Sequence, residues 1–255
     1  MKYGVCAGPD SAAILAKAGF DYVEINTSRM LKPQDPDEAF DLELKKIRSS
    51  ALPCSAGNGF LPGSLKVTGP DASLERLAAY AETAAARARK AGMETVVFGS
   101  GGARRVPDGF PRAKAEEQLQ AFLRTLGPIG RKHGVVFAVE PLRQKECNIL
   151  NTVTEAARLV REVNHPNIRL LVDAYHWAAE KESAEAIVSN GDLLRHAHIA
   201  TTKSRLAPGA EECDFSEFFR ALKAANYAGR LSIEGKWDNM ATQAARAREE
   251  LRRYQ

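Results

Sequence analysis

The segment VVFAVEP, residues 135–141, is a run of apolar and β-branched residues that ends in a carboxylate, Glu140. Three later segments repeat this pattern, each with its own metal-binding side chain: IRLLVDAYH (168–176, Asp173), LRHAHIA (194–200, His198) and GRLSIEG (229–235, Glu234). Such runs are typical of strands that are buried on both faces of a parallel sheet. Three carboxylates and one imidazole are suitable ligands for a hard divalent cation.

The same kind of run recurs along the whole chain, separated by segments with helical periodicity. The eight runs are KYGVCAG (2–8), DYVEINT (21–27), LPCSAGN (52–58), ETVVFGSG (94–101), GVVFAVEP (134–141), IRLLVDAY (168–175), LRHAHIA (194–200) and GRLSIEG (229–235). This alternation predicts one α/β domain over residues 1–255, a single (β/α)₈ TIM barrel. An open doubly wound sheet is the alternative, but it requires a glycine-rich turn that GVCAGPDS (4–11) matches poorly.

Capping residues and turns divide the chain further. Helices are expected over 71–91, with Asp71 as N-cap and Gly92 beyond the end, and over 152–163, where Thr152 and Glu155 form a capping box. Further helices are expected over 216–225 and 238–253. The irregular segments 54–70, 99–115 and 201–213 all follow strands, which in a barrel places them over the face that carries the active site.

The composition is that of an ordinary globular protein. The chain has 255 residues, 44% hydrophobic and 27% charged, and a net charge of +4. Its basic residues are scattered, so no nucleic-acid partner is expected. The four cysteines have no CxxC spacing and are interpreted as free thiols in a reducing cytoplasm. There is no secretory signal and no apolar stretch of about 20 residues, so no membrane association is expected.

The four metal-binding side chains fall on the last four predicted strands, which are neighbours around a barrel. Strand ends converge on the barrel axis, so residues far apart in sequence can surround one ion. A carboxylate at a strand end can also be a helix cap or an ion-pair partner, but four in a row favour a metal site.

Several motifs resemble the xylose-isomerase-like superfamily of TIM barrels, which contains sugar and sugar phosphate isomerases and epimerases. They are EPL (140–142), DAYH (173–176), HAHIA (196–200), SIEG (232–235), AGFDYVEI (18–25), GFLPG (59–63) and RLAPG (205–209). The closest group is that of the D-tagatose and D-psicose 3-epimerases. The resemblance covers nearly the whole chain, and it is specific to the superfamily but not to a substrate.

The resemblance implies a role for each matching residue. Glu140, Asp173, His198 and Glu234 would bind one divalent metal ion, and Glu140 and Glu234 would also form the catalytic acid–base pair. Glu146, His176 and Arg205 would bind the substrate. Arg205 lies seven residues after His198, where six are expected, so its position at the site is left open.

The implied chemistry is proton transfer next to a ketone, through an enediolate that a metal ion stabilises. The oxygen-rich ligand set favours Mn²⁺, with Mg²⁺, Co²⁺ or Zn²⁺ as alternatives. The implied function is a carbohydrate isomerase or epimerase that acts like a ketose 3-epimerase on a small sugar. Family members suggest a homodimer or homotetramer.

Further residues are weaker candidates for the site. Arg104 and Arg105, in the glycine-rich loop 98–110, could hold a phosphate or carboxylate, or they could be solvated residues of a surface turn. Asn58 ends the third run and could face the substrate or form a turn. Glu24 could contact the substrate or have a structural role, and Trp237 could form a wall of the pocket.

Three other functions remain open. The same proton chemistry would suit a lyase or epimerase that acts on 3-keto-glycosides. Apurinic-site endonucleases share the barrel, but they need several more histidines from early strands, whereas none of the five histidines here precedes residue 133. A non-catalytic metal-binding subunit is the third alternative, which the intact carboxylate pair disfavours.

Overall fold

The computed structural model describes residues 1–254. In this part of the chain, eight parallel strands form a closed barrel in sequence order. The strands are β1 (Lys2–Cys6), β2 (Tyr22–Asn26), β3 (Ala56–Asn58), β4 (Thr95–Phe98), β5 (Val136–Val139), β6 (Ile168–Asp173), β7 (Leu194–Ile199) and β8 (Arg230–Ile233). β1 pairs with β8, with Lys2 opposite Arg230, and this pairing closes the barrel. The predicted TIM barrel is confirmed, and the open sheet is excluded.

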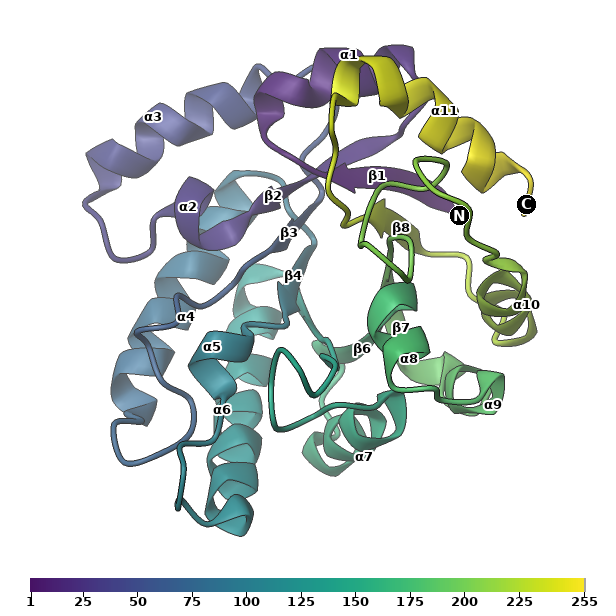
Figure 1. Cartoon of the computed structure of the whole chain (residues 1–255). Coiled ribbons are helices and arrows are strands. Elements are labelled where there is room, and N and C mark those ends of the chain that lie inside the picture. Colours follow the sequence, from purple (N-terminus) through teal and green to yellow (C-terminus); the bar gives the residue numbers. More distant parts are fainter. Residues whose placement is uncertain (255) are drawn as a thin grey trace.

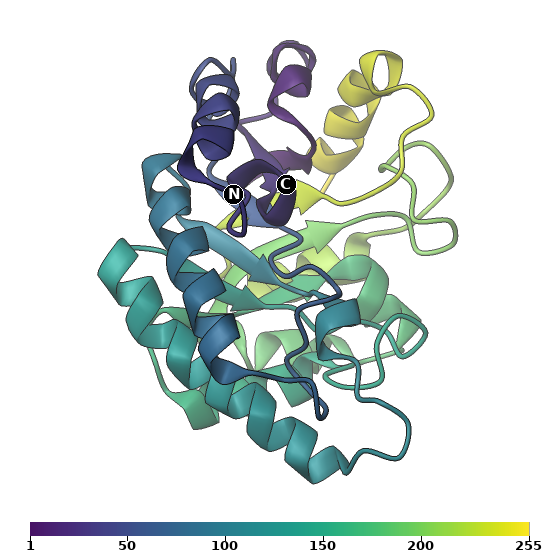
Figure 2. The same cartoon turned by 90° about the vertical axis from the view of Figure 1, so that its left-hand side faces the viewer.

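Helices surround the strands on the outside, as Figure 1 shows in a view along the barrel. They are α1 (Ala12–Lys17), α2 (Thr27–Leu31), α3 (Asp37–Arg48), α4 (Leu74–Lys90), α5 (Gly101–Arg104), α6 (Arg112–His133), α7 (Val153–Val163), α8 (Ala174–Ala179), α9 (Ala184–Val188), α10 (Ser216–Ala224) and α11 (Met240–Arg252). The long helices α4 and α6 lie side by side on one flank (Figure 2). None of the helices within residues 1–254 is both long and apolar enough to cross a bilayer.

The predicted helix boundaries hold with one correction. α4 begins at Leu74 because Ser73, rather than Asp71, is the N-cap and accepts a hydrogen bond from Arg76 N at 3.3 Å. Thr152 caps α7 as predicted, and its hydroxyl accepts from Glu155 N at 3.1 Å. The Glu155 carboxylate reaches back one residue further than a capping box requires, to Asn151 N. The segment 99–115 is partly helical, since it contains α5 and the start of α6.

Two layers of packing hold the barrel together. The main apolar core lies between the strands and the helices, and a separate small cluster is formed by Val97, Ala138 and Leu171 on β4, β5 and β6. We place this small cluster inside the barrel, because side chains alternate between the two faces of a strand. On the other side of the interior, the Tyr22 hydroxyl is hydrogen-bonded to Ser232 Oγ at 2.7 Å.

Gly4 on β1 is a position where the barrel interior has no room for a side chain. A Cβ atom added there would lie 2.4 Å from the Tyr22 ring. We predict that Gly4→Ala lowers the free energy of unfolding by about 1–3 kcal/mol, the usual cost of overpacking a core. Gly8→Ala is the matched control, because a Cβ there meets no atom within 4 Å. Denaturant unfolding of both variants tests this, and equal midpoints would contradict it.

Candidate metal and active site

The carboxyl ends of β5 to β8 bring four side chains together in the mouth of the barrel. A residue two positions beyond an inward-facing residue also faces inward. Glu140 follows Ala138 by two positions, and Asp173 follows Leu171 in the same way. The inner cluster consists of Glu140, Asp173, His198 and Glu234. Each of these residues offers one potential ligand atom, and the four atoms all lie within 4.8 Å of one another.

The His198 ring faces all three carboxylates of the inner cluster. Its Nδ1 lies 3.0 Å from Glu140 Oε1, 3.6 Å from Glu234 Oε2 and 3.9 Å from Asp173 Oδ2. Burial opposes a charge on the ring, but Glu24 and Glu234 raise the pKa of His198 well above its ordinary value. The surrounding carboxylates thus favour the protonated form of this ring. A divalent cation at this place would displace that proton, because a metal binds only the neutral ring.

The two glutamates of the inner cluster differ in their affinity for protons. Burial and the neighbouring Glu234 raise the pKa of Glu140. Burial acts on Glu234 as well, but His198 and Arg205 lower its pKa to about 2. Adjacent carboxyl groups with separated pKa values are the arrangement in which one can accept a proton while the other donates one.

The two carboxylate oxygens of Asp173 have different surroundings. Oδ1 caps α8 by accepting hydrogen bonds from Tyr175 N at 2.6 Å and His176 N at 3.2 Å. Oδ2 is buried and has no hydrogen-bond partner within residues 1–254. A buried acceptor without a partner is costly, so its position beside two other carboxylates fits a metal ligand.

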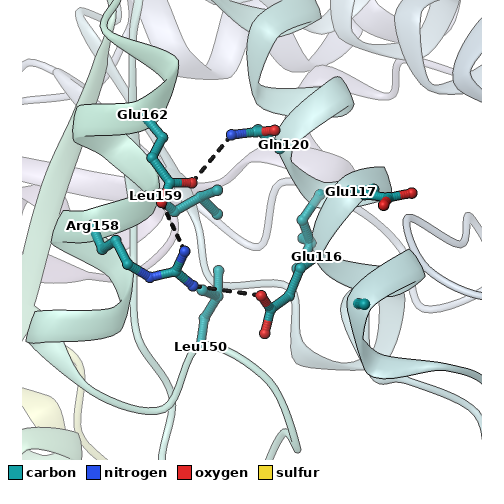
Figure 3. A pocket seen from close by; sticks show the side chains of 9 residues that line it. Glu116, Glu117, Gln120, Leu150, Arg158, Leu159 and Glu162 are labelled. Carbon is teal, nitrogen blue, oxygen red and sulfur yellow. Dashed lines mark hydrogen bonds and ion pairs between the residues drawn. The ribbon is translucent and has the colours of Figure 1, made fainter.

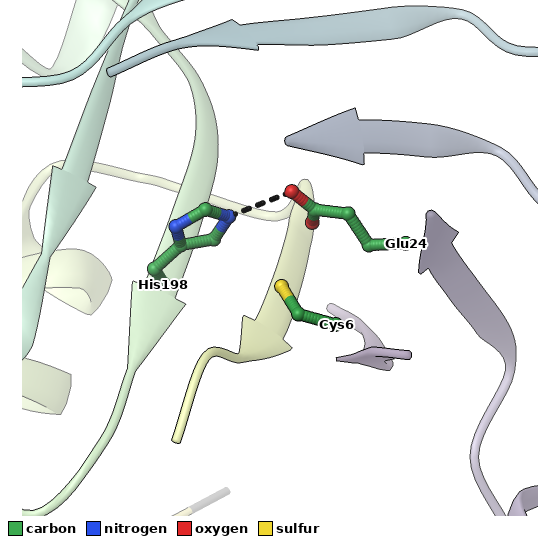
Figure 4. A group of neighbouring side chains, drawn as sticks. All are labelled: Cys6, Glu24 and His198. Carbon is green, nitrogen blue, oxygen red and sulfur yellow. Dashed lines mark hydrogen bonds and ion pairs between the residues drawn. The ribbon is translucent and has the colours of Figure 1, made fainter. Parts of the chain in front are cut away.

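A further buried carboxylate, that of Glu24, lies beneath the inner cluster. Glu24 on β2 has no exposed surface and accepts hydrogen bonds from His196 Nε2 at 2.7 Å, His198 Nε2 at 2.9 Å and Ser232 Oγ at 2.5 Å. Figure 4 shows its carboxylate directed toward the His198 ring. Although burial opposes ionisation, His198 and His196 hold the pKa of Glu24 well below its ordinary value. By accepting from Nε2–H, Glu24 orients Nδ1 of His198 toward the inner cluster, as carboxylates behind histidine ligands do.

Cys6 on β1 completes a second group of possible ligands with Glu24 and His198 (Figure 4). Two features argue against a separate metal ion there. The Glu24 oxygens already accept hydrogen bonds, and burial together with Glu24 raises the pKa of the Cys6 thiol, which disfavours the thiolate that binds metals. Cys6 and Ser232 were not among the predicted site residues, although alternation from Gly4 and Glu234 places both inside the barrel.

Arg205 lies at the inner cluster despite its offset in the sequence. Its Nη2 is 2.6 Å from Glu234 Oε2, and its Nη1 is 3.2 Å from Glu146 Oε2. The guanidinium carbon is 4.9 Å from the centre of the Tyr175 ring. The backbone of Arg205 has φ of 55°, a left-handed conformation that is uncommon outside glycine. The turn after β7 thus accommodates the extra residue.

His176 and Glu146 lie beside Arg205. His176 Nδ1 accepts a hydrogen bond from Arg143 N at 3.3 Å, which leaves its buried Nε2 as a donor without an acceptor within residues 1–254. This Nε2 is 3.9 Å from Glu146 Oε2. Arg143 Nε also donates to Glu146 Oε1, at 2.9 Å. Two guanidinium groups, an imidazole N–H donor and a carboxylate therefore surround the approach to the inner cluster, and such groups can bind sugar hydroxyls.

The weaker candidates have different surroundings. Asn58 Nδ2 donates to Glu234 Oε1 at 3.2 Å, which places Asn58 at the inner cluster. Trp237 packs half-buried against the outer apolar core, and none of its described contacts reaches the cluster. The interpretation of Arg104 as a solvated or phosphate-binding residue is wrong. Arg104 is fully buried, and it donates to Phe98 O at 3.2 Å and Leu150 O at 3.5 Å. Arg105 is exposed and donates to Glu146 O at 3.2 Å.

A cavity of about 380 Å³ adjoins the inner cluster at the ends of β1, β2 and β3. Asn58 connects the two, because it lines this cavity and contacts Glu234. The other polar groups of the wall are Cys6, Glu24, Asn26 and the exposed Arg29, and no aromatic side chain contributes. The cavity therefore suits a hydroxylated group.

Comparison with known proteins places these features in a family. The profile of the xylose isomerase-like TIM barrel family matches residues 12–255. The L-ribulose 3-epimerase of Methylomonas sp. is 29% identical over 227 residues, which are 86% of this chain and 75% of that enzyme. The D-psicose 3-epimerase of Agrobacterium fabrum is 27% identical, and the match covers 86% of this chain and 76% of that enzyme. The resemblance inferred from the motifs is thereby confirmed.

Two further similarities concern a 4-epimerase and a solved structure. The 3-dehydro-D-guloside 4-epimerase of Escherichia coli is 35% identical over 115 residues, but this match spans only 45% of this chain and 44% of that enzyme. The crystal structure of D-allulose 3-epimerase from Methylomonas sp. in complex with D-allulose superimposes with a TM-score of 0.85 at 24% identity, covering 100% of this chain and 97% of that one. At this identity, the superposition supports the fold alone.

The position of Glu24 generates a prediction about metal affinity. Glu24→Gln should weaken binding of a divalent cation roughly 10–100-fold, the usual cost of losing a carboxylate behind a histidine ligand. Calorimetric titration with Mn²⁺ measures this directly. Asp173→Asn, which changes a direct ligand, should lose more, and Glu38→Gln on the exposed face of α3 should lose nothing. Equal affinities of Glu24→Gln and Glu38→Gln would refute the orienting role.

Proposed function

Since the chain belongs to the xylose isomerase-like TIM barrel family, we propose that it is a divalent-cation-dependent sugar epimerase whose reaction resembles that of the ketose 3-epimerases. The convergence of the inner cluster on one point supports this most strongly. Two carboxylates with separated pKa values, a further carboxylate with an unpartnered oxygen and an oriented imidazole suit a metal-assisted proton transfer better than a purely structural site.

All four residues of the inner cluster would hold the cation. Three oxygen ligands and one nitrogen favour Mn²⁺, Mg²⁺ or Co²⁺ over a thiolate-type zinc site. When bound, such an ion supplies a positive charge that stabilises negative charge on the substrate oxygens during proton removal.

Glu140 and Glu234 would move the proton. One carboxylate accepts the proton from the carbon next to the carbonyl group, and the other, as the acid, returns a proton to the opposite face of the same carbon. The two residues follow β5 and β8, so their side chains reach the cluster from different parts of the barrel wall. Each general acid–base contribution is typically about 10²–10⁴-fold in rate.

Arg205, Glu146 and His176 would orient the substrate. Arg205 pairs with both Glu234 and Glu146, so it connects a proton-transfer group to a hydroxyl-binding group. The buried His176 Nε2 would donate to a substrate oxygen. The cavity beside Asn58 would receive the carbons that lie away from the reacting centre.

A second candidate is epimerisation of a 3-keto-glycoside at C4. The similarity to the E. coli 4-epimerase favours it, since that match is 35% identical. The 380 Å³ cavity also has room for a group larger than the terminal carbons of one ketose, such as the second part of a glycoside. The residues in the inner cluster would have the same roles in this reaction.

Deuterium incorporation separates these candidates and tests the two-base proposal. The Mn²⁺-loaded protein is incubated in D₂O with ketoses, ketose phosphates and 3-keto-glycosides, and the labelled carbon identifies both the substrate class and the reacting position. Glu140→Gln and Glu234→Gln should each lose about 10²–10⁴-fold in turnover, because an amide cannot accept the proton. Glu38→Gln again serves as the control. Near-normal epimerisation by Glu234→Gln would contradict the two-base mechanism.

Arg205→Ala tests substrate orientation. The variant should lose about 10²–10³-fold in kcat, comparable to the loss of one donor that acts on the transition state. Its calorimetric affinity for Mn²⁺ should stay close to that of the unmodified protein, because Arg205 is not a ligand. Arg246→Ala, an exposed arginine on α11, is the control. If Arg205→Ala matches this control on every substrate, the assignment of Arg205 fails.

A further inference from the structure

A second cavity lies outside the start of β1, at the end of the barrel opposite the inner cluster. It has a volume of about 400 Å³, within the range of about 300–1,000 Å³ typical of small-molecule sites. Its wall includes Tyr3 of β1, Asp21 before β2, Phe219 and Lys223 of α10, Arg248 of α11, and Tyr254. Both views of the chain show the start of β1 close to the end of α11 (Figures 1 and 2).

Arg248 is a buried cation without a paired anion. Its side chain is 9% exposed, and its Nε donates to Gly19 O at 2.9 Å. Nη1 is buried and has no hydrogen-bond partner within residues 1–254, and no carboxylate of this part of the chain forms an ion pair with the guanidinium. Burial and the neighbouring Arg252 lower its pKa, although Tyr3 and Asp21 act in the opposite direction. A buried charge without a counter-charge is costly, and proteins normally pair it.

The hollow between α6 and α7 shows the usual arrangement of charges. Arg158 there lies between Glu162, at 2.8 Å, and Glu116, at 3.5 Å, and Gln120 donates to Glu162 (Figure 3). The protein satisfies these charges with its own residues, and the hollow measures only about 200 Å³. At Arg248, the structure provides no equivalent partner but leaves a larger cavity beside the cation.

Aromatic side chains form the apolar part of the cavity wall. The Arg248 guanidinium lies 4.2 Å from the centre of the buried Tyr3 ring. The Phe219 and Tyr254 rings are stacked, with centroids 5.1 Å apart and an angle of 8° between their planes. Lys223 adds a second, exposed positive charge, and Asp21 is the one acid among the residues named for this wall. Its Oδ2 accepts a hydrogen bond from Tyr3 N at 2.7 Å.

We propose that this cavity binds a small organic anion with an aromatic body, whose carboxylate or phosphate group pairs with Arg248 while its ring packs against Phe219 and Tyr254. The anion would supply the charge partner that Arg248 lacks, through a charge-assisted hydrogen bond to the guanidinium. The aromatic wall would contribute apolar contact and exclude water from the ion pair. The site is separate from the inner cluster, so it stands whether or not the proposed epimerase reaction is correct.

Calorimetric titration of the full chain tests this proposal with defined probes. Benzoate and phenyl phosphate should bind saturably, and the tighter of the two identifies the preferred anionic group. Benzyl alcohol keeps the ring without the charge, and acetate and inorganic phosphate keep the charge without the ring. Each of these three should bind at least tenfold more weakly.

Two variants test whether the binding depends on Arg248. Arg248→Met keeps the length of the side chain but removes the charge, and it should bind benzoate and phenyl phosphate at least tenfold more weakly. Arg246→Gln, which removes an exposed cation of the same helix that is not part of this cavity wall, should change the affinity less than twofold. The comparison between probes uses the unmodified protein and is independent of how Arg248→Met folds. The proposal is overturned if neither aryl anion binds saturably at concentrations up to about 10 mM, or if benzyl alcohol binds as tightly as benzoate.

Discussion

The buried carboxylate of Glu24 is the interaction on which the interior of this barrel depends. An ion without exposed surface is tolerated only when hydrogen-bond donors surround it. The donors of Glu24 come from β7 and β8, so the carboxylate ties β2 to strands that lie on the other side of the β1–β8 closure. Its bond to His198 fixes which ring nitrogen faces the barrel mouth, and the geometry of the inner cluster follows from that choice.

Two glycines keep the surroundings of this network open. Gly4 leaves room for the Tyr22 ring, whose hydroxyl contacts Ser232 next to Glu24. Gly99, just after β4, leaves room for Glu140, because a Cβ there would lie 2.2 Å from Glu140 Oε2. The position of the charged residues thus depends on the absence of side chains at neighbouring strands as much as on the charged residues themselves.

Much of the fold could be predicted from sequence, because each strand is indicated by a short run of apolar and β-branched residues. The inward direction of Glu140 and Asp173 follows from alternation within one strand, so the inner cluster could be anticipated as well. The surroundings of Arg205 and Arg104 could not, because loop conformation and burial depend on packing between distant segments. Cys6 lies opposite Glu24 through the pairing of β1 with β2, whereas Ser232 comes close to Glu24 only after β1 and β8 pair. No local pattern encodes either pairing. At α4, two residues compete to cap the helix, and the sequence does not rank Asp71 against Ser73.

Because the two oxygens of Asp173 have different roles, the binding of one ligand can be coupled to the binding of another. One oxygen holds the first turn of α8, where His176 resides, and the other points toward the inner cluster. A cation that binds Oδ2 and a sugar that binds His176 would therefore both act on the first turn of the same short helix. Thermodynamic linkage then requires reciprocity: by whatever factor the cation changes the affinity for the sugar, the sugar changes the affinity for the cation by the same factor.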